Sequence, residues 1–308
     1  MNRRAMLNAL LGAATFAAGG IDAMGATGTI ARADTPRRII VLDWGLTELT
    51  LSIGVVPVGM ANVPGFRRNF TACPVPDSVV DLGLMFQPNM ELMLALKPDL
   101  IVITPAHASM RASLERIAPT VTLDMLSSSE TPYVTACAET LQLARRFDCV
   151  PRGEAVVAQA NRTLDAARAR LAALPAARDA SVYMVRFVDE SHLRVYGSHS
   201  LYGELLTTLG LRNGWRHAPQ RAPYSIIGFD ALDATGDATL VYVKPLPAST
   251  ATMMKASRVW QAMPFSKDGR MIGMAGAPAE GGILSAQYFA NALVDAFSAA
   301  PARTPEHA

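Results

Sequence analysis

The segment from Gly197 to Leu201 combines the residue types that a hydrolase uses to present a nucleophile. A nucleophile elbow reads Gly-x-Ser-x-Gly, because glycine allows the sharp turn under the serine. The last residue of this segment is Leu201 instead of glycine. We therefore predict that Ser200 caps a helix and attacks no substrate. An exported α/β enzyme remains an alternative. Turnover of an ester or phosphate substrate that is lost when Ser200 is mutated would support it.

Histidines and cysteines are the next candidates for chemistry, as ligands of a metal ion. The spacing of the histidines forms no His-x-Glu or His-Glu-x-x-His group, so no metal site built from sequence neighbours is predicted. The cysteines also lack metal-ligand spacing, and an odd number leaves at least one thiol unpaired. Cys137 and Cys149 could form one disulfide in an oxidising compartment, although three mostly buried thiols are favoured. These residues are His107, His192, His199, His217 and His307, with Cys73, Cys137 and Cys149.

Two arginines and a tryptophan are candidates for contacting a ligand. Arg67 and Arg68 follow Pro64-Gly65-Phe66 in a predicted loop. They are either a solvated pair or contacts for an anion at the mouth of a cleft. Trp44 follows the first predicted strand, at the end where ligands collect on open α/β sheets.

Alternating strands and helices must position these residues. Short apolar runs indicate buried parallel strands, and Gly54, Pro98 and Gly210 are placed to end helices. Such alternation indicates α/β lobes with mainly parallel sheets. The strands are predicted over residues 38–42, 55–60, 99–103, 180–188 and 239–243, and the helices over 47–53, 89–96, 200–210 and 285–299.

The segment from Arg152 to Leu174 has a different composition from both of its flanks. It lacks proline, contains one glycine and is rich in Ala, Arg, Leu and Glu, which favour helix. We predict one helix of about 20 residues, about 30 Å long. The predicted organisation is therefore a lobe over residues 34–151, a rigid connecting helix over 152–174 and a second lobe over 175–308. The fold class is α/β, with two Rossmann-like lobes joined by this single long helix and a ligand cleft between them.

The N-terminal segment differs in net charge from the rest of the chain, which is neutral. The chain has 308 residues, is 50% hydrophobic and carries a net charge of +2, which excludes a disordered chain and a general nucleic-acid binder. The whole excess lies within residues 1–33, which contain Arg3, Arg4 and Arg32 against Asp22. A basic start, an apolar run and Ala31-Arg32-Ala33 indicate an export signal cleaved before Asp34. Arg3-Arg4 resembles the twin-arginine pattern, with Sec export as the alternative, and we expect a periplasmic protein.

Several further segments resemble the helix-linked (class III) periplasmic substrate-binding proteins of ABC importers. Residues 87–102 resemble the Pro-Asn-x-Glu…Lys-Pro-Asp signature of that class, and residues 260–270 its second-lobe pattern. Within the class, the chain most resembles the ferric-hydroxamate binding proteins of siderophore uptake. That likeness is carried by residues 76–79, 116–119, 213–215 and 284–286, and it spans roughly residues 36–297.

The resemblance implies a set of ligand-binding residues, with departures. Trp44 and Trp215 match pocket tryptophans, whereas Met85 stands where an arginine contacts the hydroxamate oxygens and His107 where a tyrosine stands. Other pocket tryptophans are replaced as well, so an anionic chelate held by arginines becomes an alternative to a ferrichrome-like ligand. The expected ligand-binding set is Trp44, Arg67, Arg68, Met85, His107, Arg186, Trp215, Arg221 and Tyr224.

The resemblance also implies partners and a role. Glu91 and Asp230 are expected to dock onto arginines of the membrane permease, although Asp230 could equally be a helix N-cap. We expect an ABC importer component that delivers ferric siderophores, a monomer that neither catalyses a reaction nor binds nucleic acid. It would hold no cofactor or metal beyond the iron within the chelate. The alternatives are haem, cobalamin or a bare metal as ligand, with His107, His217 and Tyr224 as candidate axial residues for haem.

Overall fold

Five short strands in the N-terminal half form a sheet in which every pairing is parallel, with the apolar runs of β1 and β6 at its centre. The computed structural model describes residues 37–124, 131–217, 222–232 and 237–300, so the predicted export signal lies outside the described residues. The strand order is β3-β2-β1-β6-β7. These strands are β1 (Ile39–Val41), β2 (Gly59–Met60), β3 (Val80–Asp81), β6 (Leu100–Ile103) and β7 (Thr120–Thr122).

Helices and one small hairpin connect these strands. The helix predicted over residues 47–53 begins earlier, because the Asp43 side chain accepts the Leu46 N–H and caps the helix at Trp44. The strand predicted over residues 55–60 shortens to its last two residues. The connecting elements are α1 (Trp44–Ser52), α2 (Val63–Asn69), β4 (Gly83–Leu84), β5 (Gln87–Pro88), α3 (Met90–Ala95), η1 (Pro105–Met110) and α4 (Arg111–Leu114), and α5 (Pro132–Arg146) follows the last strand.

The prediction of a loop around Arg67 and Arg68 is wrong, because both residues lie in the last turn of α2. The preceding Pro64-Gly65 suggested a turn. Proline is favoured in the first turn of a helix, and the Asn62 side chain accepts the Gly65 N–H at 3.0 Å as an N-cap. Two basic residues in a last turn also complement the helix dipole.

The C-terminal half builds a mixed sheet with an antiparallel edge. The order is β11-β9-β8-β12-β13, with β10 also pairing with β8. Strands β8, β10, β12 and β13 pair in parallel, whereas β9 and β11 pair antiparallel to their neighbours. The strands are β8 (Ser181–Phe187), β9 (His192–Tyr196), β10 (Arg212–Asn213), β11 (Tyr224–Gly228), β12 (Thr239–Val243) and β13 (Met271–Met274).

The two faces of this sheet pack against different groups of residues. Tyr183, Val185 and Phe187 of β8 join one hydrophobic cluster together with Trp215 and Trp260. The alternate β8 residues Val182 and Met184 join another cluster, which includes residues of α6, α7 and α11. Residues of opposite parity on β8 therefore belong to different faces. The helices of this half are α7 (Leu201–Thr208), η2 (Phe229–Ala231), α8 (Ala248–Ala256), α9 (Arg258–Ala262), α10 (Pro264–Lys267) and α11 (Ile283–Ser298).

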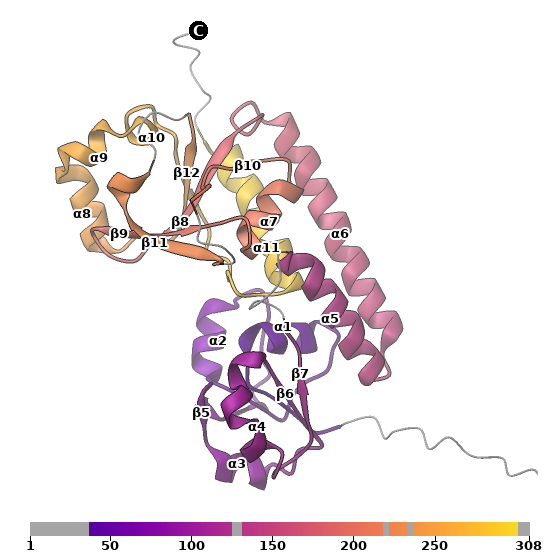
Figure 1. Ribbon diagram of the computed structural model, residues 1–308. Coiled ribbons are helices and arrows are strands. Elements are labelled where there is room, and N and C mark those ends of the chain that lie inside the picture. Colours follow the sequence, from indigo (N-terminus) through magenta and orange to yellow (C-terminus); the bar gives the residue numbers. More distant parts are fainter. Residues whose placement is uncertain (1–36, 125–130, 218–221, 233–236, 301–308) are drawn as a thin grey trace, which may run out of the picture. The chain divides into compact units, whose positions relative to one another are not determined.

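The predicted connecting helix is α6 (Val150–Ala173), within two residues of its expected bounds. It buries Ala160, Leu164, Ala167 and Leu171 at the spacing of one helical face. This face packs against α5 and α11 (Figure 1). From Thr35 onward the chain forms one unit, so the lobe boundaries at residues 151 and 174 remain predictions.

A buried carboxylate joins the first helix to the last. Glu48 of α1 accepts the Ser285 backbone N–H at 2.8 Å and also the Ser285 hydroxyl. Burial raises the pKa of Glu48, and the donors of Ser285, Gly282 and Leu284 at the start of α11 oppose that rise. This contact fixes the beginning of α11 and the loop in front of it. In the described part of the chain, no helix has the length and apolar character that a membrane span requires.

Candidate functional site

The candidate site begins at the carboxyl ends of β1 and β6, where open α/β sheets collect ligands. Asp43 follows β1 and caps α1, with its Oδ1 atom accepting the Leu46 N–H at 2.9 Å. Burial raises the pKa of Asp43, while the Leu46 N–H opposes that rise. A buried carboxylate is thus held at the strand end by helix amides.

His107 lies beyond β6 and is 1% exposed. Its Nδ1 atom accepts the Thr104 backbone N–H at 3.3 Å and lies 2.9 Å from the Thr104 hydroxyl oxygen. A nitrogen that accepts a backbone N–H carries no proton, so the ring proton lies on Nε2. Nε2 is buried, with no hydrogen-bond partner among the residues described. His107 therefore keeps one donor available.

The hairpin of β4 and β5 covers His107. Phe86, at its turn, is exposed and stacks on the imidazole with ring centroids 4.9 Å apart. The adjacent Met85 instead packs against the cluster of Ile40, Leu82 and Ile101. The hairpin therefore contributes an aromatic ring to the candidate site, although the resemblance pointed to position 85.

Two arginines face each other across β8 and β9. Arg186 pairs directly with Arg194 in the antiparallel register, an arrangement that costs stability for like charges. Their Nε atoms are buried and have no hydrogen-bond partner within the described segments. Arg194 also lies over the Tyr224 ring, 4.2 Å from its centroid. Paired guanidinium groups with unused donors are suited to bind an anionic or strongly polar oxygen ligand.

Tyrosines surround this arginine pair on the same face of the sheet. Tyr196 pairs with Tyr224 across β9 and β11, and the Tyr202 hydroxyl donates to the Ala277 carbonyl. Burial raises the pKa of Tyr196, and Glu280 acts in the same direction while both arginines oppose it. Its hydroxyl therefore stays protonated near neutral pH. A small hollow of about 50 Å³ opens here, lined partly by Tyr196, Tyr224 and Glu280.

Glu280 connects the two groups of residues. It lies in the loop between β13 and α11, and its Oε1 atom is 3.6 Å from Nη1 of Arg194. Its charge also raises the pKa of Asp43, although less than burial does. The site thus combines Asp43 and His107 of the first half with Arg186, Arg194 and Glu280 of the second. It is a mixed-charge binding surface, and the described residues contain no metal-ligating group of three His, Cys, Asp or Glu side chains.

Trp44 and Arg67 make packing and polar contacts within the first half of the chain, and Arg68 is exposed. Trp44 donates its indole N–H to the Ala61 carbonyl at 3.1 Å and meets Phe66 and Phe70 edge to face. Arg67 forms an ion pair with Asp77 at 2.7 Å, and Arg68 is exposed on the same helix. Arg221 lies outside the described residues.

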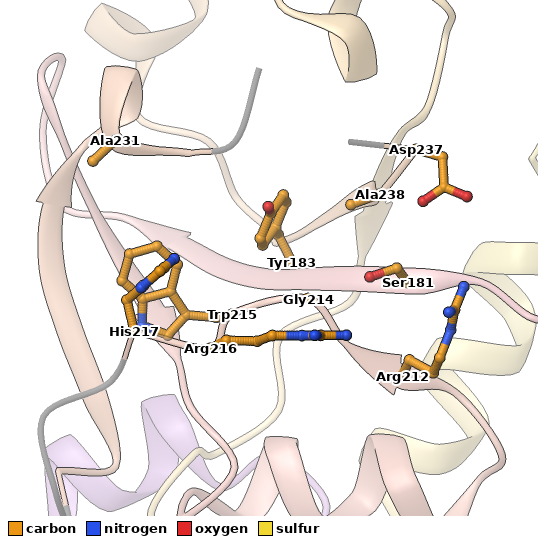
Figure 2. Close-up of a pocket in the computed structure, with 10 residues that line it drawn as sticks. All are labelled: Ser181, Tyr183, Arg212, Gly214, Trp215, Arg216, His217, Ala231, Asp237 and Ala238. Carbon is orange, nitrogen blue, oxygen red and sulfur yellow. The ribbon is translucent and has the colours of Figure 1, made fainter. Parts of the chain in front are cut away.

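Trp215 belongs to the other face of the second sheet. It packs with Tyr183 and Val185, whereas Arg186 has the opposite parity on β8. Trp215 borders an open cavity of about 420 Å³. Figure 2 shows Trp215 and His217 at one end of this cavity, with Arg212 and Ser181 at the other. The structure therefore does not bring Trp215 to the arginine pair. His217 lines this cavity, whereas Tyr224 lines the small hollow beside the arginine pair.

The remaining predicted residues have clear local environments. Ser200 is a helix cap as predicted, because its Oγ atom accepts the Gly203 N–H at 2.9 Å. Glu91 is exposed in the first turn of α3. Asp230 is exposed within η2, where Gly228 occupies the N-cap position. The alternative role of Asp230 as a helix cap is therefore wrong. All three cysteines are free thiols.

Sequence reasoning missed Asp43, Phe86, Arg194 and Glu280. Asp43 had a usable signal, because an aspartate between a strand and a helix is a common N-cap. Arg194 also had one, since His192-Leu193-Arg194-Val195-Tyr196 alternates as a half-buried strand does. Phe86 and Glu280 lie in a turn and a loop whose position only the tertiary structure determines.

Comparison with known proteins gives one family match and several relatives. Residues 39–277 match the model of the periplasmic binding protein family, Peripla_BP_2. The iron(3+)-hydroxamate-binding protein FhuD of Escherichia coli is 29% identical over 266 residues, covering 86% of this chain and 88% of that protein. The ferric-anguibactin-binding protein FatB of Vibrio anguillarum is 30% identical over 181 residues, covering 58% of this chain and 54% of that protein.

A solved structure is also similar over most of the chain. The siderophore-binding protein FhuD of Vibrio cholerae, bound to Fe3+-Desferal, superposes with a TM-score of 0.79 at 27% identity. The match covers 86% of this chain and 99% of that one. It confirms the predicted α/β fold, and the family match confirms the predicted class.

Proposed function

Because the chain belongs to the periplasmic binding protein family, we propose that it captures ferric siderophores and delivers them to an ABC permease. The family consists of substrate-binding proteins and not of enzymes. Relatives named for iron-hydroxamate and ferric-anguibactin binding support an iron chelate as the ligand. The iron would arrive as cargo within its chelator, so that the protein itself needs no cofactor.

The observation that carries this proposal is the cross-strand pair of Arg186 and Arg194. Each guanidinium keeps a buried Nε–H that has no hydrogen-bond partner among the residues described, and leaving such a donor unpaired costs free energy. The oxygen atoms that coordinate Fe3+ in a siderophore carry negative charge and can accept these hydrogen bonds. The ring of Phe86, the Nε2–H of His107 and the Tyr196 hydroxyl would complete the contacts.

Titration of the purified protein with ferric chelates tests this function. Ferrioxamine B and ferric dicitrate are the probes, and quenching of intrinsic tryptophan fluorescence is the readout. We expect at least one probe to bind, and Arg186→Gln or Arg194→Gln to weaken it about tenfold or more, the worth of one charge-assisted hydrogen bond.

Arg216→Gln is the matched control. Arg216 is exposed and lines the cavity on the other face of the sheet, so its loss should leave the affinity unchanged. Equal weakening by all three substitutions would argue against a specific site at the arginine pair. Failure of every ferric probe to bind the unaltered protein would refute the proposed function.

The location and the partner form the second part of the proposal. The basic start, apolar run and small-x-small motif of residues 1–33 support export to the periplasm. Glu91 and Asp230 are both exposed and would dock onto the permease as one acidic contact from each half. The double substitution Glu91→Arg with Asp230→Arg should abolish iron uptake by cells while chelate binding stays intact. Loss of binding itself would refute this assignment.

A further inference from the structure

Glu280 is a charged side chain on a loop that is held firmly in place. Its neighbours Ala279 and Gly281 are buried, and the Tyr202 hydroxyl donates to Ala277 just upstream. Downstream, a Cβ at Gly281 would lie 2.8 Å from a Glu48 oxygen, so the backbone has little room to shift. The Glu280 side chain is nevertheless 59% exposed. The loop therefore presents a carboxylate from a fixed position.

This carboxylate opposes the arginine pair without bonding to it tightly. The separation of 3.6 Å between Glu280 and Arg194 is too long for a charge-assisted hydrogen bond, which spans about 2.7–2.9 Å. Exposed ion pairs of this kind contribute little stability. A ligand oxygen can therefore approach Arg194 without first breaking a strong interaction. The negative charge of Glu280 remains beside it, with the buried Asp43 carboxylate within electrostatic reach.

We propose that Glu280 sets the net charge of the chelate that the site accepts. The arginine pair attracts the negative oxygens around the iron, while Glu280 repels additional negative charge elsewhere on the same ligand. The site then prefers chelates that are neutral or positively charged at their periphery over anionic ones. This inference rests on the proposed function, because it assigns a selective role within the same ferric-siderophore site.

A matched ligand series tests this role. The free amine of ferrioxamine B gives a cationic pendant group, its acetylated form a neutral one and its succinylated form an anionic one. All three share the same iron-binding core, so that their affinities differ through the pendant charge. We expect Glu280→Gln to shift the preference toward the succinylated chelate about tenfold relative to the amine form. The two pendant groups differ by two unit charges, and each would interact with Glu280 across a largely hydrated gap of about 6–8 Å.

Two variants and one condition make the result specific. Glu280→Asp keeps the charge and should retain the original preference, and Glu154→Gln removes an exposed carboxylate on α6 and should change nothing. In the unaltered protein, high salt should reduce the preference because it screens exposed charges. The acetylated chelate reports whether Glu280→Gln still forms an intact site.

The possible outcomes separate the two proposals. An unchanged preference in Glu280→Gln, with the acetylated chelate still bound, overturns the role of Glu280 and leaves the proposed function in place. If neither the three ferrioxamines nor ferric dicitrate bind the unaltered protein, the proposed function falls and this inference falls with it. A shift of the same size in Glu154→Gln would show a general charge effect and would also overturn the role of Glu280.

Discussion

Replacing Ser285 with alanine removes one of the donors that hold the buried Glu48 carboxylate. The hydroxyl donates to Glu48 and the Ser285 backbone N–H donates at 2.8 Å, and the substitution removes the hydroxyl while the backbone donors remain. A hydrogen bond to a charged group contributes about 1.5–3 kcal/mol. We therefore expect Ser285→Ala to lower the free energy of unfolding by about 2 kcal/mol, which corresponds to about 3 °C in melting temperature for a chain of this size.

The same loss should depend on pH. The pKa of Glu48 is raised by burial, so at about pH 4 the group is protonated and the missing bond is a neutral one, worth about 1 kcal/mol. The destabilisation should grow as the pH rises through the raised pKa and the carboxylate ionises. Differential scanning calorimetry of both proteins at pH 4 and pH 8 measures this difference.

Ser298→Ala is the control on the same helix. The Ser298 hydroxyl donates to the Val294 carbonyl at 2.8 Å near the exposed end of α11, so its removal should cost less than about 0.5 kcal/mol at either pH. Equal losses for Ser285→Ala and Ser298→Ala, or a loss for Ser285→Ala that is the same at both pH values, would refute the reasoning.

Three further outcomes are expected. A carboxyl group whose pKa is raised in the folded state stabilises the protein at low pH, and this stabilisation is lost as the pH rises through that pKa. In Glu48→Gln the free energy of unfolding should therefore change less between pH 4 and pH 8 than in the unaltered protein. Burial raises the pKa of Cys73 to about 12, so alkylation with iodoacetamide at pH 8, followed by mass spectrometry, should label Cys149 long before Cys73 until the protein is unfolded. Gly203→Ala should lower the free energy of unfolding by about 1–3 kcal/mol or more, because the new Cβ would clash with the Gly197 carbonyl oxygen. A melting temperature equal to that of the unaltered protein would contradict this expectation.

Much of the fold follows from local patterns in the sequence. The strand predicted over Thr239–Val243 matches β12, and α7 has the predicted cap at Ser200 and stop at Gly210, which has a φ of 84°. These elements are predictable because the apolar run, the cap and the glycine each act through neighbours in the chain. The helix α2 was missed because Pro64-Gly65 fits both a turn and a first helical turn, and the cap at Asn62 decides between them.

The candidate site is less predictable because its members meet only in the tertiary structure. Arg186 and Arg194 become partners through the register of an antiparallel pair, and a shift of one residue would send one of them to the other face. Trp215 likewise packs with β8 residues of the parity opposite to Arg186, although both residues were expected in one ligand-binding set. The distance between Glu280 and Arg194 depends on a loop whose path is fixed by Glu48, far away in the sequence.

The contact between Glu48 and Ser285 has a consequence for how the chain folds as it is synthesised. The two residues are 237 positions apart, so the ribosome makes the carboxylate long before its donors. Until α11 is made, Glu48 lacks its Ser285 donors, so it must either stay hydrated or be buried in the protonated form. We therefore expect a chain that ends before Ser285 to hold α1 less firmly, and limited proteolysis should cut it near α1 sooner than the full chain.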